Sequence, residues 1–447
     1  MPYISALNPM PMVPRMVPAA VMNRIEHLTP RIRDMFSPDV KVRLTATEEV
    51  GKALAAIGIP QTNTMGNHYH GKHSWGPGYP ASLAFFSAAN GLSVTGLVDH
   101  YSVSGALEFR KASFTHFGIP ATVGYEVRSL IRDRLICGGL DLSKTVMNSP
   151  GNPGEIYVVF HGFPGNRNSW LALARQDKFK RYESVTAKIN DNISSRCAGL
   201  SPIDFQSVVA LSEEGNITDR HLMDVLFDMV FDHCQGNFDD VVDRITSWWG
   251  AITADEQAGL DSAKDDEFSK YMLIAHSMMR GRLLKDGKLG YIAPSEIEAP
   301  SLGNLSRIAD EEDSILVYPA YKFDIPYLEH LIPMLVRDHG FRSLSLMFDR
   351  NTPDERAKIL RCAEESVIPA FSGMDVNNWS QTWVNKFSDI PEFIEGALAL
   401  VGHEISVRAG KLGLFDNTWF PNTPAGLKQR LQHFAFLGSQ WKDATAS

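Results

Sequence analysis

The chain has 447 residues, of which 44% are hydrophobic and 21% charged, and its formal net charge is −9. This length exceeds that of one small module and provides enough apolar residues for a core that needs no disulfide support. A dedicated binder of long nucleic acid is usually basic, so the acidic balance argues against that class of protein. It still allows a small anion to bind in a locally basic pocket.

Cysteine spacing and hydropathy restrict the environment of the protein. The four cysteines lie far apart without CxxC spacing, which argues against a disulfide scaffold or a thiolate zinc cluster; they are Cys137, Cys197, Cys234 and Cys362. We therefore expect a reducing, cytoplasmic location. No segment approaches the roughly 18 apolar residues that a membrane-spanning helix requires, so we expect no membrane partner.

The N-terminal segment begins with the Pro- and Met-rich run MPYISALNPMPMVPRMVPAAVMNRIEHL. Its prolines interrupt every apolar stretch, unlike the continuous apolar region of a signal peptide. We interpret residues 1–60 as an arm that is extended and packed on the body or on a second subunit, with a disordered tail as the alternative. A homo-oligomer is compatible with this interpretation.

Two regions of the chain alternate short apolar runs with helical patterns. Buried strands are expected at residues 93–100, 121–127, 156–160, 315–319, 344–348 and 368–373. Helices are expected at residues 80–90, 104–117 and 325–339, each followed by a glycine. A further helix begins at the capping box TPDE, with Pro353 at its first position. Such alternation indicates parallel β/α units.

The middle of the chain has a different pattern. Residues 166–294 lack strand signals and carry amphipathic helical patterns at residues 221–231, 239–249 and 268–284. We interpret this segment as a helical insertion between two parts of one barrel, residues 61–165 and 295–400. Residues 401–447 form a C-terminal extension without a clear motif.

Histidines gather in one short segment. His68, His70 and His73 form the pattern H-x-H-x-x-H beside glycines, in a segment that is too polar for a core. In an extended strand, His68 and His70 would face the same way, because side chains alternate with a period of two. Two imidazoles on one side of a strand end provide half of a metal site. The alternative is a surface loop that happens to contain histidines.

Other ligand types stand at the ends of predicted strands. They are Asp99 and His100, Glu126, His161 and Asp375. In a β/α barrel the carboxyl ends of the strands meet at one mouth, where active sites lie. One such residue alone is more often a cap or an ion-pair partner, but the joint pattern predicts a His/carboxylate site. Imidazole and carboxylate ligands suit Zn, Mn or Fe.

The run GNHYHGKH…GLVDH…GYEV resembles the opening of a polymerase and histidinol phosphatase (PHP) domain. That family begins with His-x-His, then a helix, a strand ending in Asp-His and a strand ending in Gly-x-Glu. VVFHG, GNITDRHL, KDGKLGYIAPSEIE and SGMDVN resemble later PHP segments, so the resemblance spans about residues 66–377. It is nearest to the branch of bacterial phosphoesterases that act on nucleotides and short RNA ends. It implies an α/β fold, a distorted (β/α)7 TIM-like barrel with a helical insertion and up to three metal ions at its mouth.

The resemblance also implies three sets of metal ligands. The first set is His68, His70, Glu126 and Asp375, and all four are present. The second set is Glu126, His161 and a histidine that is replaced here by Tyr318. The third set is His100 and two family ligands that are replaced here by Trp75 and Asn377. We therefore expect one or two divalent ions, Mn, Zn or Fe.

Two further positions concern the same ligand sets. The family has an Asp two residues before the first His, and Gly66 stands there in this chain. His73 is a candidate substitute for the ligand that Trp75 replaces.

Basic residues follow the third strand-end histidine; they are Arg167, Arg175, Lys178, Lys180 and Arg181. The resemblance implies phosphate-binding arginines in the insertion, and Arg181 and Arg220 are the nearest matches. Arginine suits phosphate oxygens because its planar fork donates two parallel hydrogen bonds. The alternative is a solvated helix face.

The sequence thus predicts a metal-dependent phosphoesterase that acts on a small phosphorylated metabolite or nucleotide. His100, His161 or His221 would protonate the leaving oxygen, and we expect His221 to lie near the metals, over the barrel mouth. One alternative keeps the metal but changes the reaction to another hydrolysis, a lyase step or a redox step in specialised metabolism. Another is a catalytically decayed binding protein.

Overall fold

The computed structural model describes residues 16–165, 169–263, 268–322, 324–347, 350–373, 375–378, 381, 391–416 and 419–442. The chain forms two compact units. One, the barrel unit, comprises Pro9–Ala172 and Ala299–Ser447; the other, the helical unit, includes Leu173–Glu298. The two units are described separately below.

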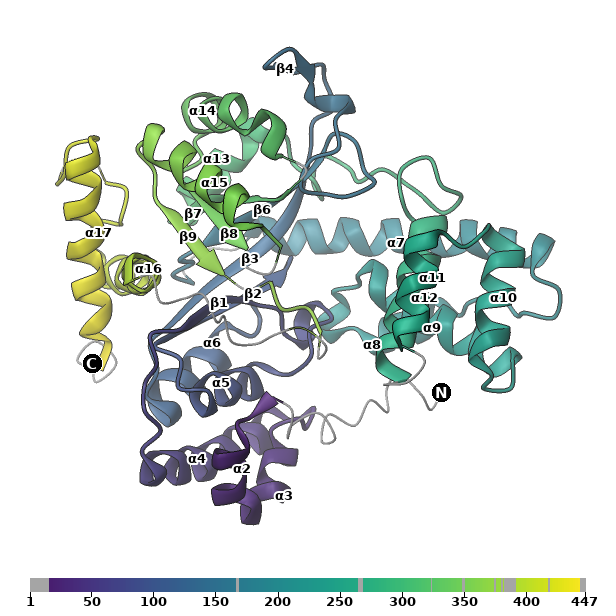
Figure 1. Cartoon of the computed structure of the whole chain (residues 1–447), viewed down its shortest axis with the longest axis horizontal. Coiled ribbons are helices and arrows are strands. Elements are labelled where there is room, and N and C mark those ends of the chain that lie inside the picture. The colour runs from purple at the N-terminus through teal and green to yellow at the C-terminus, as the bar shows by residue number, and fades with distance from the viewer. Residues whose placement is uncertain are drawn as a thin grey trace. The chain divides into compact units, whose positions relative to one another are not determined.

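A seven-stranded sheet forms the centre of the barrel unit, in the order β1-β2-β3-β6-β7-β8-β9 (Figure 1). The strands are β1 (Met65–Tyr69), β2 (Val94–His100), β3 (Ala121–Leu130), β6 (Glu155–His161), β7 (Ile315–Ala320), β8 (Ser343–Met347) and β9 (Ala370–Gly373). A parallel bridge between Tyr69 and Val376 joins the first edge to the last. The sheet therefore closes into a barrel, and the predicted α/β TIM-like fold is confirmed.

One strand departs from the parallel pattern predicted for the barrel. Strand β6 runs antiparallel to both of its neighbours, β3 and β7. Between β3 and β6 the chain forms only the small pair β4 (Ile136–Cys137) and β5 (Leu140–Asp141) and the short turn η4 (Leu142–Lys144). A parallel return needs a long crossover, usually a helix, so without one the chain comes back in the opposite direction.

Helices cover the barrel strands. They are α5 (Pro80–Ala89), α6 (Ala106–Arg110), which continues as the π-helix η3 (Lys111–Phe117), α13 (Leu302–Glu311), η6 (Ile325–Tyr327), α14 (Leu328–His339) and α15 (Pro353–Glu365). The predicted capping box is present, because Thr352 and Glu355 each accept a hydrogen bond from the other's backbone N–H.

The C-terminal extension, for which the sequence showed no motif, is helical. It contains α17 (Pro424–Ser439), which lies beside α16 (Pro391–Arg408) in Figure 1. Gly402 and Gly438 make this contact close. A Cβ on Gly402 would overlap the carbonyl of Phe434, and one on Gly438 would overlap the carbonyl of Leu398. Only glycine allows the two helix backbones to approach in this way.

The predicted extended arm is wrong for the described part of the N-terminal segment. That part forms α2 (Ala19–Ile25), η1 (Glu26–Leu28), α3 (Thr29–Asp34) and α4 (Val40–Ile57). Proline at a helix start costs no hydrogen bond, and here Pro18 is the N-cap of α2 while Pro30 lies in the first turn of α3. The buried ion pair of Arg43 with Glu108 joins α4 to α6. The prolines before residue 16 lie outside the described residues.

The helical unit contains no strand among its described residues. Its elements are α7 (Ser169–Arg196, which begins in the barrel unit), α8 (Phe205–Leu211), η5 (Glu213–Gly215), α9 (Asp219–His233), α10 (Phe238–Trp249), α11 (Ala254–Ala263) and α12 (Phe268–Leu283). The predicted helices at 221–231, 239–249 and 268–284 correspond to α9, α10 and α12. Their apolar faces share one core, which includes Phe227, Ile245 and Met279.

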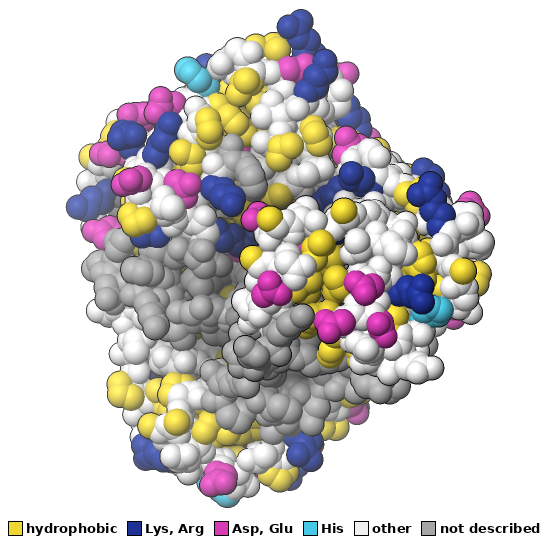
Figure 2. Space-filling view, turned by 45° about the vertical axis from the view of Figure 1, so that its right-hand side comes forward, with side chains coloured by type: hydrophobic (Ala, Val, Ile, Leu, Met, Phe, Trp, Pro, Cys, Tyr) yellow, Lys and Arg dark blue, Asp and Glu magenta, His cyan; other side chains and the backbone are white. Residues whose placement is uncertain are grey.

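The described helices and one face of the surface bear on membrane and nucleic-acid binding. No described helix is long and apolar enough to cross a membrane. On the face in Figure 2, Lys and Arg side chains are interspersed with Asp and Glu. Among the described side chains of that face, the basic ones form no continuous stripe of the kind that binds long nucleic acid.

Candidate metal centre

Two strands bring imidazole and carboxylate groups together inside the barrel. Among the described residues, one group of His, Cys, Asp or Glu side chains could hold a metal ion: His68, His70 and Glu126, whose ligand atoms all lie within 4.8 Å of one another. His68 lies on β1, His70 follows it directly, and Glu126 lies on β3. All three are buried, so the alternative of histidines in a surface loop is wrong.

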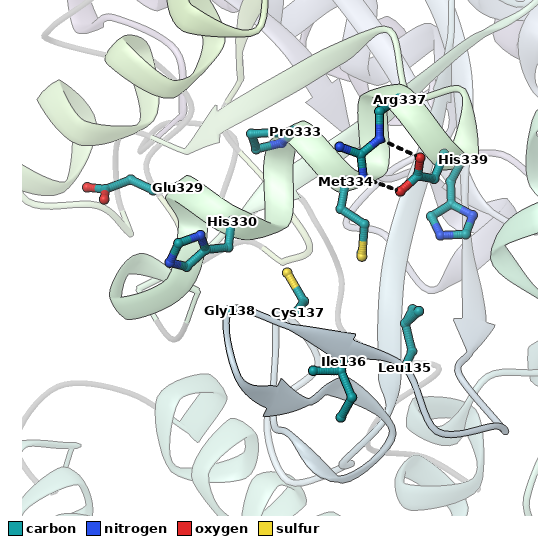
Figure 3. A pocket seen from close by; sticks show the side chains of 11 residues that line it. Leu135, Ile136, Cys137, Gly138, Glu329, His330, Pro333, Met334, Arg337 and His339 are labelled. Atoms are coloured by element: carbon teal, nitrogen blue, oxygen red, sulfur yellow. Dashed lines mark hydrogen bonds and ion pairs between the residues drawn. The ribbon is translucent and has the colours of Figure 1, made fainter.

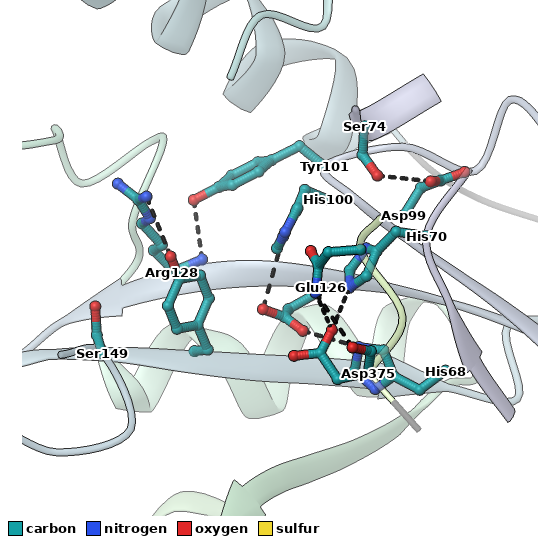
Figure 4. A network of polar contacts seen from close by, with 12 residues as sticks. His68, His70, Ser74, Asp99, His100, Tyr101, Glu126, Arg128, Ser149 and Asp375 are labelled. Atoms are coloured by element: carbon teal, nitrogen blue, oxygen red, sulfur yellow. Dashed lines mark hydrogen bonds and ion pairs between the residues drawn. The ribbon is translucent and has the colours of Figure 1, made fainter. Parts of the chain in front are cut away.

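The fourth predicted ligand joins this group from the far end of the sequence. Asp375, shortly after β9, places Oδ1 3.1 Å from Nε2 of His70, while Nε2 of His68 lies 3.0 Å from Oε2 of Glu126. Figure 4 shows these four side chains converging. The bridge between Tyr69 and Val376 fixes the arrangement, because it holds the chain on either side of the ligands in register.

His100 extends the cluster on the side of β2. Its ring stacks on that of His70 with centroids 4.4 Å apart, and its Nδ1 lies 3.6 Å from Oε1 of Glu126. Register explains the contact with Glu126, because His100 and Glu126 are direct partners in the parallel pair β2–β3. The side chain is 24% exposed, so His100 connects the buried cluster to solvent.

The charges of the cluster stabilise one another. Burial alone would raise the pKa of Asp375, but Arg350, His70 and His68 hold it well below its usual range. Burial opposes protonation of His70, yet its hydrogen bond with Asp375 and the nearby carboxylates raise its pKa overall. A buried carboxylate that stays ionised between imidazoles is the donor set that a divalent cation requires.

The contacts at the ring nitrogens show which groups orient His68 and His70. Nδ1 of His68 and Nδ1 of His70 have no hydrogen-bond partner among the described residues. The carboxylates at Nε2 are therefore the groups that orient these two rings. Nitrogen and oxygen donors converge on one buried point, which is the arrangement that Zn, Mn or Fe would use.

Tyr321 and Arg350 also contact Asp375, and sequence reasoning missed both. The hydroxyl of Tyr321 donates to Oδ2 of Asp375 at 3.0 Å, and Nη2 of Arg350 lies 2.5 Å from the same oxygen. Both residues follow predicted strands, since Tyr321 comes directly after β7 and Arg350 three residues after β8. Extending the search at strand ends by a few residues would have found them.

His161 lies deeper than predicted. Because β6 is antiparallel, its last residue pairs with Ile315, the first residue of β7. The ring is fully buried with its centroid 6.1 Å from that of His68, and neither ring nitrogen has a hydrogen-bond partner among the described residues. Burial and the neighbouring His68 lower the pKa of His161 to about 3. His161 is therefore neutral at ordinary pH.

The structure does not bring Tyr318 to the cluster. Its neighbour Val317 pairs with Val159, which pairs with Glu126, so these three side chains share the inner face and Tyr318 points to the outer one. There its ring packs against Phe341. Burial, with the charge of Asp324, raises the pKa of Tyr318 well above its usual value, which disfavours the phenolate that a metal would need.

The carboxylate of Asp99 forms hydrogen bonds with the turn that follows β1. Its Oδ1 accepts hydrogen bonds from the backbone N–H of Gly71 and the hydroxyl of Ser74, both at 2.6 Å. It thus fixes the turn that follows His70, as Figure 4 shows for Ser74. His73 lies in this turn, in η2 (Lys72–Ser74), but does not belong to the metal-capable group.

The remaining family departures have clear local consequences. Asn377 lies at the cluster, where its side-chain amide donates to Oδ1 of Asp375. A Cβ at Gly66 would overlap the hydroxyl of Tyr69. The side chain of Tyr69 therefore fills the space that an Asp at position 66 would need. Trp75 ends η2 with a left-handed backbone, φ 78°.

Three predicted residues belong to the helical unit. Arg181 forms a two-pronged ion pair with the buried Glu298, with both contacts at 2.6 Å, so its guanidinium is already engaged and its predicted role with phosphate is not supported. His221 accepts a hydrogen bond from the backbone N–H of Thr218 and caps its own helix. Arg220 precedes it on α9. The position of His221 near the metals stays a prediction, and Arg167 lies outside the described residues.

A separate cavity of about 530 Å³ lies in the barrel unit between the β4–β5 pair and α14 (Figure 3). Ile136, Cys137, His330, Met334 and His339 are among its lining residues. It contains none of the predicted site residues, so the metal-capable group and this cavity are distinct features.

Two solved structures are similar to this chain over most of its length. A protein described as a metal-dependent phosphoesterase from Bifidobacterium adolescentis matches with TM-score 0.47 and 17% identity over 72% of this chain and 91% of that chain. An amidohydrolase from Chromobacterium violaceum, with bound sulfate and no metal, matches with TM-score 0.47 and 17% identity over 70% and 87%. No family model and no curated protein matches the chain. Likenesses of this strength assign no reaction, so the resemblance to PHP proteins rests on the motifs and on their placement in the barrel.

Proposed function

We propose that the protein is a metal-dependent phosphoesterase that acts on a small phosphorylated metabolite or nucleotide. The observation that carries the proposal is the buried convergence of His68, His70 and Glu126 within 4.8 Å, with Asp375 against His70. Four residues predicted from motifs up to 307 positions apart meet at one point of the fold. A chance assembly of surface histidines would not bury two imidazoles and two carboxylates together.

His68, His70, Glu126 and Asp375 would hold the ion. A divalent ion bound there supplies an acidified water and polarises a phosphoryl oxygen. The protein itself supplies the geometry: β1 positions His68, β3 positions Glu126, and the bridge between Tyr69 and Val376 positions the adjacent His70 and Asp375. Rigid placement of this kind is what lowers the barrier to an in-line displacement at phosphorus.

His100 is the candidate that we favour for protonating the leaving oxygen. It contacts the cluster and is partly exposed, so a substrate oxygen can reach it. His161 is disfavoured because burial keeps it neutral, with a pKa of about 3, and a neutral buried imidazole is a poor proton donor at ordinary pH. His221 remains a candidate from the sequence alone.

Metal content and phosphate release test the proposal. We expect the full-length protein to retain Mn, Zn or Fe, and His70→Ala to lose it, because removal of one ligand leaves buried charges unpaired. His330→Ala, an exposed histidine of α14, is the matched control and should keep the wild-type metal content. Release of phosphate from a panel of phosphomonoesters and nucleotides should follow the metal content. Equal metal in His70→Ala and wild type would refute the assignment of the site.

A further inference from the structure

Arg350 stands between the candidate metal ligands and solvent. Its Nη2 lies 2.5 Å from Oδ2 of Asp375, and its Nη1 donates to the hydroxyl of Tyr321. The guanidinium lies over the Tyr321 ring, 5.1 Å from its centroid. A cationic fork is thus held beside a carboxylate that also faces the imidazoles.

Exposure separates this ion pair from the structural arginine pairs of the barrel unit. Arg43 is 5% exposed against Glu108, and Arg110 is 10% exposed against Glu404. Arg350 is 28% exposed, although its partner Asp375 is only 8% exposed. The carboxylate thus belongs to the buried cluster, while the guanidinium is accessible from solvent. A residue that binds a ligand from solution needs this accessibility.

Asp375 does not depend on Arg350 for its orientation. The Tyr321 hydroxyl donates to Oδ2, and the Asn377 amide donates to Oδ1, the oxygen that faces His70. The side-chain amide of Gln381 donates to the backbone carbonyl of Asp375 at 2.9 Å. Loss of the Arg350 side chain should therefore remove a positive charge without releasing the carboxylate.

We propose that Arg350 binds the anionic phosphoryl group of the substrate and competes with the divalent cation for the charge of Asp375. This inference rests on the proposed function, because it assigns a specificity residue to the same site. A cation bound to Asp375 weakens the attraction between that carboxylate and Arg350. The guanidinium of Arg350 can then turn toward an added anion. The two ligands then have opposite relations to Arg350: it repels the cation and attracts the anion.

Binding measurements on the full-length protein test this inference without an activity assay. The variants are Arg350→Gln and Arg350→Lys, and the control is Arg337→Gln, a 72% exposed arginine paired with Asp338 on α14. Mn²⁺ binding is measured by calorimetry, and binding of radiolabelled inorganic phosphate at micromolar concentration is measured by equilibrium dialysis with saturating Mn²⁺. Melting temperatures show whether each variant folds.

The expected changes have opposite signs. Arg350→Gln should bind Mn²⁺ more tightly, on the order of tenfold, because a neighbouring positive charge is removed. It should bind phosphate more weakly, by about tenfold or more, because charge-assisted hydrogen bonds are lost. Arg350→Lys should keep wild-type affinity for Mn²⁺, since the charge remains, and should bind phosphate more weakly, since the fork is lost.

Four results would overturn the inference. Weaker binding of both ligands by Arg350→Gln would show a structural role, and affinities equal to those of Arg337→Gln would show no role. Wild-type protein that binds Mn²⁺ but no phosphate would also overturn it and leave the metal site standing. Wild-type protein that binds none of Mn²⁺, Zn²⁺ and Fe²⁺ in the same calorimetric measurement would refute the proposed function and the inference together, so the two failures are distinguishable.

Discussion

Glu312 gives the barrel unit a pH-dependent stability that can be measured. It directly follows α13, is 4% exposed, and accepts a hydrogen bond from the hydroxyl of Tyr125, the residue before Glu126 on β3. Burial is the main cause that raises its pKa from 4.5 to about 7, and the charge of Glu311 adds to it against the opposing hydrogen bond. In the unfolded chain the carboxyl returns to its ordinary value. Its contribution to stability is thus fully present below pH 4.5 and is lost as the pH rises through about 7.

The substitution Glu312→Gln removes this dependence. A shift of about 2.5 pH units corresponds to roughly 3 kcal/mol of unfolding free energy, an upper value that applies above pH 7. The variant should match the wild type near pH 4.5 and be more stable at pH 8.5, because a neutral amide keeps the acceptor for Tyr125 without a buried charge. Thermal unfolding followed across pH 4.5–8.5 measures the difference, with the exposed Glu329→Gln as control. A difference between variant and wild type that does not change with pH would refute the reasoning.

Three further expectations concern packing, ion pairing and ligand linkage. Gly66→Asp introduces the residue that PHP proteins have at this position but should lower the unfolding free energy by about 1–3 kcal/mol, because its Cβ overlaps the hydroxyl of Tyr69; an unchanged melting temperature would contradict this. Arg43→Met should cost about 3–5 kcal/mol in denaturant titration, since Glu108 stays buried without its partner, and a cost under about 1 kcal/mol would argue against it. Mn²⁺ at about 100 times its dissociation constant should stabilise the protein by about 2.7 kcal/mol, an effect that His70→Ala should abolish and that chelation should reverse.

The sequence predicted most of the barrel because its strands are short apolar runs bounded by turns. It did not predict the direction of β6, since a strand's direction depends on the path of the connection before it and not on its own residues. It also did not identify β1 as a buried strand. The run MGNHY is polar, yet every residue in it is buried. His68 in this run and His70 directly after it are buried because they contact the carboxylates of Glu126 and Asp375, and Asp375 lies 305 positions from His70.

The candidate metal ligands were predictable as a set because their residue types recur at strand ends. The residues that surround them were harder to find. Asp99 is also a carboxylate near the end of a strand, but it accepts a hydrogen bond from the backbone N–H of Gly71 and so stabilises the turn there. Arg350 showed no motif, and only the folded chain places it against Asp375. The position of a residue along a strand thus indicates which end of the barrel its side chain reaches. Its role depends on the residues that it contacts in the folded chain.

The number of ions that we expect the barrel to hold follows from the same contacts. The first ligand set is together, because His68, His70 and Glu126 converge and Asp375 lies against His70. In the second ligand set, Tyr318 points to the outer face of the sheet and cannot act as a ligand. Glu126 and the more deeply placed His161 are the two remaining members of that set.

The third set is reduced further. It keeps His100, but Trp75 offers only a donor, and the amide of Asn377 already donates to Asp375. We therefore expect one tightly bound ion per chain, with a second only if His161 contributes, and weak turnover of ordinary phosphomonoesters if further ions must clamp the phosphate. Elemental analysis by mass spectrometry after gentle purification measures the ratio, and His161→Asn tests the second ion separately. Three ions per chain would show this reasoning to be wrong. The described residues contain one group that could hold a metal ion, His68, His70 and Glu126, and two further ions would need ligands outside it.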